Sequence, residues 1–363
     1  MPLMRPPLRQ IAWRVLASRP VQSLLRPRMR NRGVVFMLHR VTDPELGVSG
    51  HDPGELRRFL SFLRERRFSV VDAEELLAWT RDPKGEPGPK VAFTMDDGYP
   101  DQARAARTVF ADYDVRVTIF PIVDFLDGEG WMWWDRLTHL LTHTEKSVIE
   151  LGSHGVIERR TLDLSTPHAT EASLHETVMD FRRLSTGTRG RALAQVEEQC
   201  QVDIPDEPPP AFAPMSWDDA RQLEAMGHRF GPHSMSHPTL VRESDSDVRT
   251  EIEESWRRLQ VELTDPAPVF CYPYGAGDDF GEREMRILQG AGIEAAFGSE
   301  GGYITTASPS SPPQESPLEA FRLPRFGFPL DMASFVRIIS GLDPDGTRTM
   351  PARRGEVVRN PLA

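Results

Sequence analysis

Short runs of apolar, β-branched residues alternate along this chain with segments whose apolar residues recur at helical spacing. The runs predict strands at Gly33–Leu38, Phe68–Val71, Lys90–Met95, Val115–Ile122, Arg229–Gly231, Val269–Tyr272, Ala295–Phe297 and Phe321–Leu323. The intervening periodicity predicts helices at Gly54–Arg67, around Leu76 and Leu77, at Asp245–Leu263 and at Gly281–Gly290. This alternation is typical of the α/β class, in which helices wrap a parallel sheet.

The alternation stops between Asp127 and Pro214. This stretch begins with an aromatic cluster, GWMWWDRL, continues with helices predicted near Glu171–Leu184 and Arg189–Cys200, and ends in DEPPP. We interpret it as a helical insertion that returns through a Pro-rich segment. The expected organisation is a basic arm (1–32), an α/β body (33–342) with the insertion at about 127–214, and a mobile tail (343–363). The linker-like segment 306–318 predicts a long loop.

Charge is distributed unevenly along the 363 residues. Residues 1–33 contain eight arginines and no Asp or Glu, so the net charge of -11 becomes -19 for the rest. The acidic balance argues against a nucleic-acid binder. Leu8, Ile11, Val15 and Leu16 lie loosely on one face of a short helix, and a basic amphipathic segment can lie on an anionic membrane surface. A flexible arm, or a helix packed on its own domain, is at least as good an interpretation.

Hydropathy and cysteine content bear on the compartment. The mean hydropathy is -0.42 and no apolar run approaches ~18 residues, which argues against a membrane-spanning protein. Cys200 and Cys271 cannot build a disulfide framework. Arg9, Arg14 and Arg19 interrupt the apolar centre that a secretory signal requires. We therefore expect a cytoplasmic protein, with peripheral contact to the inner membrane face as an option and the oligomeric state open.

Two adjacent carboxylates follow the predicted strand Lys90–Met95. Asp96 and Asp97 therefore lie at the carboxyl end of a buried parallel strand, where α/β folds place their active sites. Their side chains point in different directions, so one can bind a metal while the other remains free as a base. Gly98 allows a tight turn. The alternative is a helix N-cap with a spare acid.

A pair of histidines follows another short strand, in GPHSMSHPTL. His233 and His237 are four residues apart, so on a helical turn both imidazoles face one side and can share an ion, and Pro238 ends that turn. Histidines at this spacing are more often surface residues than ligands. These two, however, follow a strand, and Asp97 would complete a two-histidine, one-carboxylate set.

A third motif, FCYPYG, ends the strand predicted at Val269–Tyr272. Its Tyr-Pro-Tyr-Gly sequence predicts a rigid turn that can aim a backbone N–H at a developing oxyanion. Taken alone, an ordinary strand-ending turn is the better interpretation.

In their order and spacing, the three motifs resemble those of the polysaccharide deacetylases, the NodB-like carbohydrate esterases of family 4. Asp96–Gly98 matches the D-D-G motif, His233–Pro238 the H-[ST]-x-x-H-P motif, and Pro273–Gly275 the end of R-x-P-Y-G. The resemblance extends from Val34 to Phe326. The LHRV opening, the WW-D cluster and SWDDARQLEAMGHRFGPHS look most like the exopolysaccharide-cluster branch. The resemblance implies a divergent (β/α) barrel of NodB-homology type.

The resemblance also implies metal-dependent removal of N-acetyl groups from an amino-sugar polysaccharide or lipid-linked saccharide. Asp97, His233 and His237 would hold one divalent ion, by default zinc, with cobalt, nickel or iron as alternatives. Asp96 would be the general base, and the backbone N–H of Tyr274 would help to stabilise the oxyanion. The alternatives are O-deacetylation, deformylation or cyclic-amide hydrolysis at the same site, and a catalytically silent glycan-binding protein.

The sequence departs from the family pattern at two positions. Much of the family begins the third motif with an arginine that pairs with the catalytic aspartate, whereas this chain has Cys271 there. We predict that Arg325 replaces that arginine and orients Asp96; a plain surface arginine is the alternative. The late L-x-H motif, which supplies the proton for the leaving amine, is missing. His39 is the residue predicted to donate that proton or to contact the sugar, with a buried structural histidine as the alternative.

Aromatic side chains near a carbohydrate site commonly stack on sugar faces. Trp133 and Tyr272 are the predicted substrate-binding residues. Trp131, Trp133 and Trp134 can instead hold the insertion against the barrel. Cys271 is expected to be an inert core residue and not a ligand.

Overall fold

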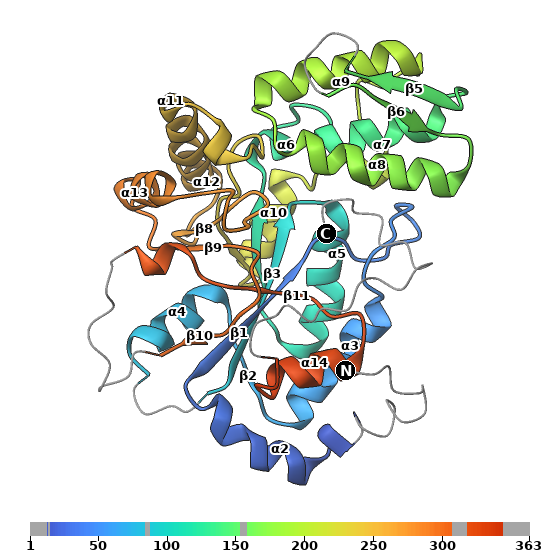
Figure 1. The fold of residues 1–363 in the computed structure, drawn as a ribbon. Helices are drawn as coiled ribbons and strands as arrows, with labels where there is room; N and C mark the ends of the chain where they lie inside the picture. Colours follow the sequence, from blue (N-terminus) through green and yellow to red (C-terminus); the bar gives the residue numbers. More distant parts are fainter. Residues whose placement is uncertain (1–12, 14, 84–87, 153–157, 307–317, 344–363) are drawn as a thin grey trace.

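The computed structural model describes residues 13, 15–83, 88–152, 158–306 and 318–343 (Figure 1). Three predictions therefore fall wholly or mainly outside the described residues. These are the mobile tail, the long loop over 306–318, and the part of the helix face formed by Leu8 and Ile11.

A sheet that is parallel except for its edge strand β10 forms the centre of the fold. Its strands and the smaller strand pairs are β1 Arg32–Leu38, β2 Ser69–Val70, β3 Lys90–Asp97, β4 Thr118–Pro121, β5 Val148–Leu151, β6 Arg160–Asp163, β7 Arg229–Phe230, β8 Val269–Cys271, β9 Ala295–Phe297, β10 Ile304–Thr305 and β11 Phe326–Gly327. The main sheet has the order β10-β1-β3-β4-β7, with β11 paired to β1 and β2 to β3. β3 is buried at every position, as a strand covered on both faces must be.

Main-chain hydrogen bonds continue the sheet into an irregular barrel. Beyond β7, the Cys271 N–H donates to Pro232 and links the parallel β8–β9 pair. Beyond β9, Leu323 bridges to Phe297, and β11 then pairs with β1. The result is the divergent (β/α) barrel that the sequence predicts.

Helices surround this barrel. Their bounds, with the 3-10 and π-helical turns marked η, are α2 Arg19–Leu25, η1 Arg26–Met29, α3 Pro53–Glu65, α4 Ala73–Arg81, α5 Pro100–Ala105, η2 Ala106–Phe110, η3 Ala111–Tyr113, α6 Val123–Leu126, α7 Trp133–His143, α8 Pro167–Phe181, α9 Thr186–Cys200, η4 Pro210–Phe212, α10 Trp217–Ala225, η5 Leu240–Arg242, α11 Asp245–Arg249, η6 Thr250–Glu254, α12 Ser255–Glu262, α13 Glu282–Gly290, η7 Glu319–Phe321 and α14 Met332–Ile339. Local sequence explains several starts: Asp52 caps α3 and Asp72 closes a capping box on α4.

The structure differs from the prediction at the last strand and in the insertion. The strand predicted at Phe321–Leu323 is wrong, because Phe321 ends the 3-10 turn η7 and only Leu323 makes a bridge. Pro324 has no N–H to continue a ladder, so the last strand begins at Phe326. The insertion also contains an antiparallel hairpin, β5–β6, beside its helices.

The insertion has a hydrophobic core of its own. Buried residues of α7, α8, α9, β5 and β6 form a cluster separate from that of the barrel. In Figure 1 these elements lie together above the barrel, at the end towards which the parallel strands run. The insertion is therefore next to the carboxyl ends of β3 and β4.

The described part of the basic arm packs on the opposite end of the barrel. Gln22 is buried in α2, and its Nε2 donates to Ser340 Oγ at 2.8 Å. Arg66 Nη2 donates to the Ala17 carbonyl at 2.8 Å. The described part of the arm therefore includes a helix that packs on its own domain. None of the helices in the described residues is long and apolar enough to cross a bilayer.

Candidate active site

The two carboxylates predicted to form the site end strand β3. Asp96 and Asp97 are its last residues, each 2% exposed. Asp97 has a φ of 85° and Gly98 a φ of 92°, so the chain turns sharply as soon as the strand ends. Since successive side chains of a strand point to opposite faces, the two carboxylates meet different partners.

Asp96 is held by a buried arginine. Arg325 Nη1 lies 2.7 Å from Asp96 Oδ1, and Nη2 lies 2.8 Å from Oδ2. Arg325 is 1% exposed and also donates to Gly298 O and to Thr94 Oγ1. Burial raises the pKa of Asp96, but the charge and hydrogen bonds of Arg325 outweigh it and lower the pKa to about 2. Asp96 is therefore a fixed, ionised carboxylate.

The small side chain of Cys271 leaves the room that Arg325 occupies. Cys271 Sγ lies 3.0 Å from Arg325 Nη2 and 3.5 Å from Asp96 Oδ2. Burial raises the pKa of the Cys271 thiol well above its ordinary value, so the sulfur stays protonated. At the position of the family's motif arginine, this chain thus has a small thiol against an arginine that comes from a later segment.

Asp97 faces the two histidines. Its Oδ1 lies 3.7 Å from His233 Nε2 and 3.9 Å from His237 Nε2, and the three candidate ligand atoms all lie within 4.8 Å of one another. His233 Nδ1 lies 2.7 Å from the Cys271 carbonyl, which can only accept, so Nδ1 carries the proton and Nε2 keeps its lone pair. A backbone partner of this kind commonly orients a metal-binding histidine.

The protonation states of these three residues fit a divalent cation. Burial lowers the pKa of His233 to about 4 and that of His237 well below its ordinary value, so both imidazoles are neutral. Burial and the neighbouring Asp96 raise the pKa of Asp97 well above its usual value, so the ionised carboxylate would be favoured by a cation bound beside it. A second group, Asp96, His233 and Cys271, is also close together, but Arg325 already engages Asp96 and the thiol is protonated. The Asp97 set is the better candidate metal centre.

The segment that carries the histidines is not the helical turn that the spacing predicts. Residues 231–239 form a loop, in which Ser234 has a φ of 65° and His237 a φ of 58°. Non-glycine residues in this left-handed region cost free energy and cluster at functional sites. The His237 N–H donates to Ser234 Oγ, which stabilises the conformation.

Glu251 stabilises the loop that carries the two histidines, and it was not among the predicted site residues. Its Oε2 accepts from the Met235 and Ser236 N–H groups, each at 2.9 Å, and its Oε1 accepts from Ser236 Oγ at 2.6 Å. Glu251 lies in η6, a π-helical turn that interrupts the long helix predicted there. Such turns often occur at functional sites. Nothing in the local sequence distinguishes this glutamate from its acidic neighbours.

Tyr274 lies beside the candidate metal centre with strained backbone. Its φ is 62°, and its ring meets the His237 ring edge to face, with centroids 4.7 Å apart. The Tyr274 N–H donates to no acceptor among the described residues. A free backbone donor at this position fits the predicted oxyanion role.

The structure places His39 against Asp96. His39 Nε2 lies 3.9 Å from Asp96 Oδ2, and the His39 side chain is 15% exposed. Burial lowers the pKa of His39, which makes the neutral imidazole its resting form. In that form the ring can accept a proton.

The structure does not bring Tyr272 into the site, and it buries Trp133. Strand alternation points Cys271 towards Asp96 and Tyr272 away, where its ring stacks on Phe280 at 3.7 Å and is 1% exposed. Trp133 is 9% exposed and packs in the core of the insertion, with Arg189 over its ring. Neither ring presents a face to solvent in this conformation.

The neighbouring indole, Trp134, contacts the site instead. Its ring meets the His237 ring edge to face, with centroids 4.9 Å apart, and its Nε1 donates to Tyr99 Oη at 2.9 Å. Tyr99 in turn donates to Asp135 Oδ2 at 2.6 Å. Burial raises the pKa of Asp135 to about 7. This buried network joins α7 of the insertion to the histidine loop. Its members adjoin motifs already singled out, since Tyr99 follows Asp-Asp-Gly and Trp134 and Asp135 belong to the WW-D cluster.

Fold and site together define a (β/α)-barrel protein with a candidate metal centre at the carboxyl ends of its strands. The sequence matches the polysaccharide deacetylase family over residues 84–199 and 194–296, more than half of the chain. The chain therefore belongs to the polysaccharide deacetylase family. The NodB-type barrel expected from the motifs is confirmed.

Solved structures show the same fold. The deacetylase PplD of Streptococcus pyogenes, solved with acetate, has a TM-score of 0.54 at 13% identity, covering 85% of this chain and 99% of its own. IcaB from Ammonifex degensii has a TM-score of 0.51 at 17% identity, covering 85% and 97%. A polysaccharide deacetylase of Bacillus anthracis, BA0330, has a TM-score of 0.52 at 13% identity, covering 85% and 69%. Among curated proteins, none matches this chain.

Proposed function

We propose that this protein is a metal-dependent hydrolase that removes N-acetyl groups from an amino-sugar polysaccharide or lipid-linked saccharide. The observation that carries the proposal is that two adjacent buried carboxylates have different partners. Asp97 lies within 4 Å of two neutral histidines, whereas Asp96 is held in a bidentate ion pair. Family membership supports deacetylation, and the choice of an N-acetyl group is part of the proposal.

Asp97, His233 and His237 would hold the metal, with zinc as the first choice. A bound divalent ion polarises an acyl carbonyl and lowers the pKa of water. The three residues contribute two neutral nitrogens and one carboxylate oxygen, which leaves open positions in the coordination sphere.

Asp96 would act as the general base and receive the proton of the attacking water. Arg325 keeps Asp96 ionised and in one orientation, so the carboxylate is a weak base that acts on an already acidified water. His39 Nε2, 3.9 Å from Asp96 Oδ2, would take that proton on and deliver it to the leaving amine. The neutral resting form of His39 suits this transfer, because it can accept before it donates.

The Tyr274 N–H would donate to the oxyanion as the acyl carbon becomes tetrahedral. The strained backbone at Tyr274 and the turn at Gly275 hold this donor in place. Trp134 and the Tyr274 ring enclose His237 from two sides, which excludes water from the ligand.

Acetate release from N-acetylglucosamine oligomers tests this function. We expect release with added zinc, none after removal of metal by a chelator, and a loss of at least 100-fold for Asp96→Asn. Asp218→Asn, at an exposed position with the same chemical change, is the matched control. Wild-type activity of Asp96→Asn would exclude Asp96 as the base. Release from O-acetylated sugars alone would exclude the N-acetyl proposal.

A second experiment tests which polysaccharide is the substrate in the cell. In a strain whose only copy carries Asp97→Asn, mass spectrometry of the surface polysaccharide precursor should show one extra acetyl group per repeat. An unchanged acetylation pattern would contradict a role in that polysaccharide.

A further inference from the structure

The end of the barrel opposite the candidate active site carries a basic surface. It is formed by α2, η1 and the carboxyl end of α3, and it lies at the bottom of Figure 1. Arg19, Arg28 and Arg30 are exposed there and have no acidic partner among the described residues. Residues 1–42 contain no Asp or Glu, so these arginines have no acidic neighbour within their own segment.

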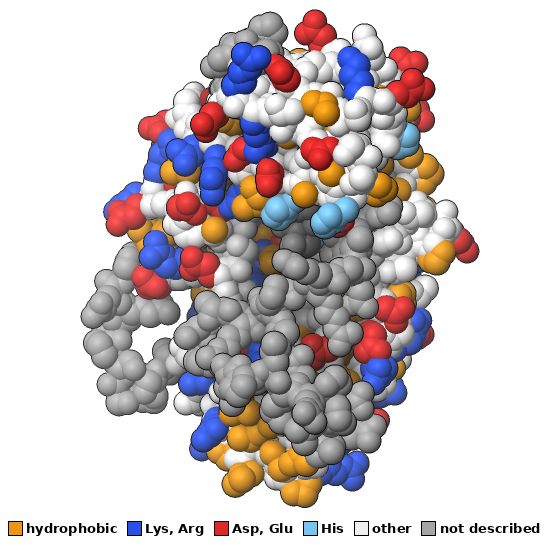
Figure 2. All heavy atoms as spheres, turned by 45° about the vertical axis from the view of Figure 1, so that its right-hand side comes forward, with side chains coloured by type: hydrophobic (Ala, Val, Ile, Leu, Met, Phe, Trp, Pro, Cys, Tyr) orange, Lys and Arg blue, Asp and Glu red, His pale blue; other side chains and the backbone are white. Residues whose placement is uncertain are grey.

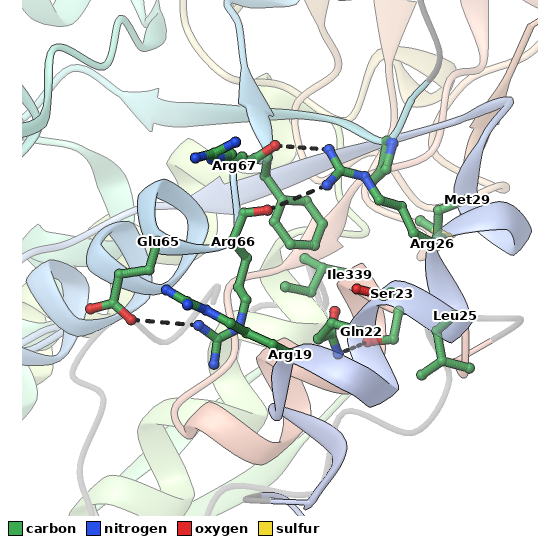
Figure 3. Close-up of a pocket in the computed structure, with 13 residues that line it drawn as sticks. Arg19, Gln22, Ser23, Leu25, Arg26, Met29, Glu65, Arg66, Arg67 and Ile339 are labelled. Carbon is green, nitrogen blue, oxygen red and sulfur yellow. Dashed lines mark hydrogen bonds and ion pairs between the residues drawn. The ribbon is translucent and has the colours of Figure 1, made fainter.

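A cavity of about 290 Å³ opens into this surface (Figure 3). Arg19, Arg26, Arg66 and Arg67 line it, with Glu65 as the acidic residue among them. Arg26 and Arg66 are fixed in place, because their guanidinium groups donate to backbone carbonyls of Arg67 and Ala17. The apolar side chains of Leu25, Met29 and Ile339 also line it. Arginine and apolar side chains around one cavity suit a phosphate group that is attached to a hydrocarbon chain.

Exposed apolar side chains stand beside these arginines. Leu24 is 78% exposed and Val15 56% exposed, and both belong to the same segment as the cavity. Figure 2 shows hydrophobic side chains at the lower end of the molecule, with basic side chains at their edges. Basic and apolar residues mixed on one exposed helix are typical of helices that lie in a membrane interface.

We propose that this surface binds a phospholipid bilayer containing anionic lipid, with Leu24 entering the interface and the Figure 3 cavity receiving a lipid phosphate. Charge complementarity supports a lipid surface, because residues 1–33 carry eight arginines and no acidic residue, whereas the rest of the chain carries -19. The exposed leucine favours a bilayer over a nucleic acid, which offers it no apolar environment. Because α2 is held to the barrel by the Gln22–Ser340 hydrogen bond, the contact orients the whole domain.

This orientation bears on the substrate, a step that rests on the proposed function. The basic surface lies at the amino end of β3, which begins at Lys90, and the strand ends seven residues later at the carboxylate of Asp97. At about 3.3 Å per residue, the strand separates the two by roughly 23 Å, so the site lies at the far end of the barrel from the bilayer. The enzyme would then act on sugars that extend from the membrane, and not on a sugar joined directly to a lipid phosphate.

Vesicle co-sedimentation of the full chain tests the contact without any turnover. We expect binding to vesicles of phosphatidylcholine with 30% phosphatidylglycerol, and little binding to phosphatidylcholine alone. Replacing Arg19, Arg28 and Arg30 by Gln should weaken binding about 100-fold, since each basic residue at an anionic surface contributes roughly fivefold. The matched control replaces Arg183, Arg191 and Arg242, three exposed arginines on other surfaces, by Gln. Equal binding of the two triple variants would overturn the proposal.

An environment-sensitive dye tests the orientation. The native cysteines are buried, so a dye can be attached at Leu24→Cys, or at Val241→Cys on the side of the candidate active site. We expect a blue shift on anionic vesicles for the dye at position 24 and none at position 241. A shift at position 241, or none at position 24, would overturn the proposed orientation. Because neither measurement uses catalysis, failure here leaves the proposed deacetylase untouched.

Discussion

The ion pair between Arg325 and Asp96 offers the sharpest test of the site. Arg325→Ala removes two charge-assisted hydrogen bonds from a carboxylate that is 2% exposed. Lowering the pKa of Asp96 from 3.8 to about 2 corresponds to about 2 kcal/mol of stability at neutral pH. Leaving the buried carboxylate without its partner raises the expected loss to about 3–5 kcal/mol.

The sign of the pH dependence follows from the same pair. In the wild type, the folded pKa of Asp96 lies below its unfolded value, so this stability is present above about pH 4 and is lost as pH falls through about 2. Without Arg325, burial raises the pKa of Asp96 above its ordinary value. The stability deficit of Arg325→Ala should therefore be largest at pH 7 and shrink towards pH 3.5. Urea unfolding at the two pH values measures it.

Activity gives an independent readout. With zinc present, Arg325→Ala should lower kcat/KM about 100-fold and move the acid limb of its pH profile upwards, because Asp96 must be ionised to act as a base. Arg325→Lys keeps the positive charge, so its kcat/KM should lie between those of the wild type and of Arg325→Ala. Adding Cys271→Arg to Arg325→Ala returns an arginine to the family's motif position and should restore part of the activity. Unchanged activity and an unchanged acid limb in Arg325→Ala would refute this reasoning.

Three further predictions concern the framework of the site. Glu251→Gln should weaken zinc affinity about 10-fold or more by loosening the histidine loop, as measured by competition with a chelator; unchanged affinity would contradict this support. Gly231→Ala should destabilise the protein by about 2–3 kcal/mol, because its Cβ would lie 2.1 Å from the Val269 carbonyl oxygen. Gly190→Ala, in open space within α9, should stabilise it by about 1 kcal/mol. Denaturant unfolding measures both, and a Gly231→Ala variant more stable than Gly190→Ala would contradict this reasoning. Burial raises the folded pKa of Asp135 to about 7, so its ionisation costs stability as pH rises from 4 to 7. Asp135→Asn should reduce that loss by roughly 3 kcal/mol, and unfolding of both proteins at pH 4 and pH 7 checks this.

Local pattern was sufficient for much of the fold. The fully buried strand β3 and the helix Pro53–Glu65 follow from apolar runs, apolar periodicity and capping residues that lie within a few positions of one another. The prediction failed at Phe321–Leu323, where Pro324 and a 3-10 turn leave a single bridge. It also missed the hairpin β5–β6, although Val148–Leu151 alternates exposed and buried positions.

The candidate site was likewise predicted in part. The motifs themselves named Asp96, Asp97, His233 and His237, because each lies next to a strand end that the sequence reveals. Their spacing did not predict the left-handed backbone of the histidine loop, which depends on a distant carboxylate, Glu251.

By itself, the sequence pattern determined the α/β class and the motifs that contain Asp96, Asp97, His233 and His237, since short-range signals specify both; the barrel was implied by the resemblance of those motifs to a family. Only the tertiary structure decided which aromatic residues meet the site: Trp134 faces His237, whereas Tyr272 turns into the core. It also decided that Arg19 and Arg26 gather with Arg66 and Arg67 around one cavity. The physical reason is that such contacts join residues far apart in the chain, and their partners are selected by packing and charge in three dimensions.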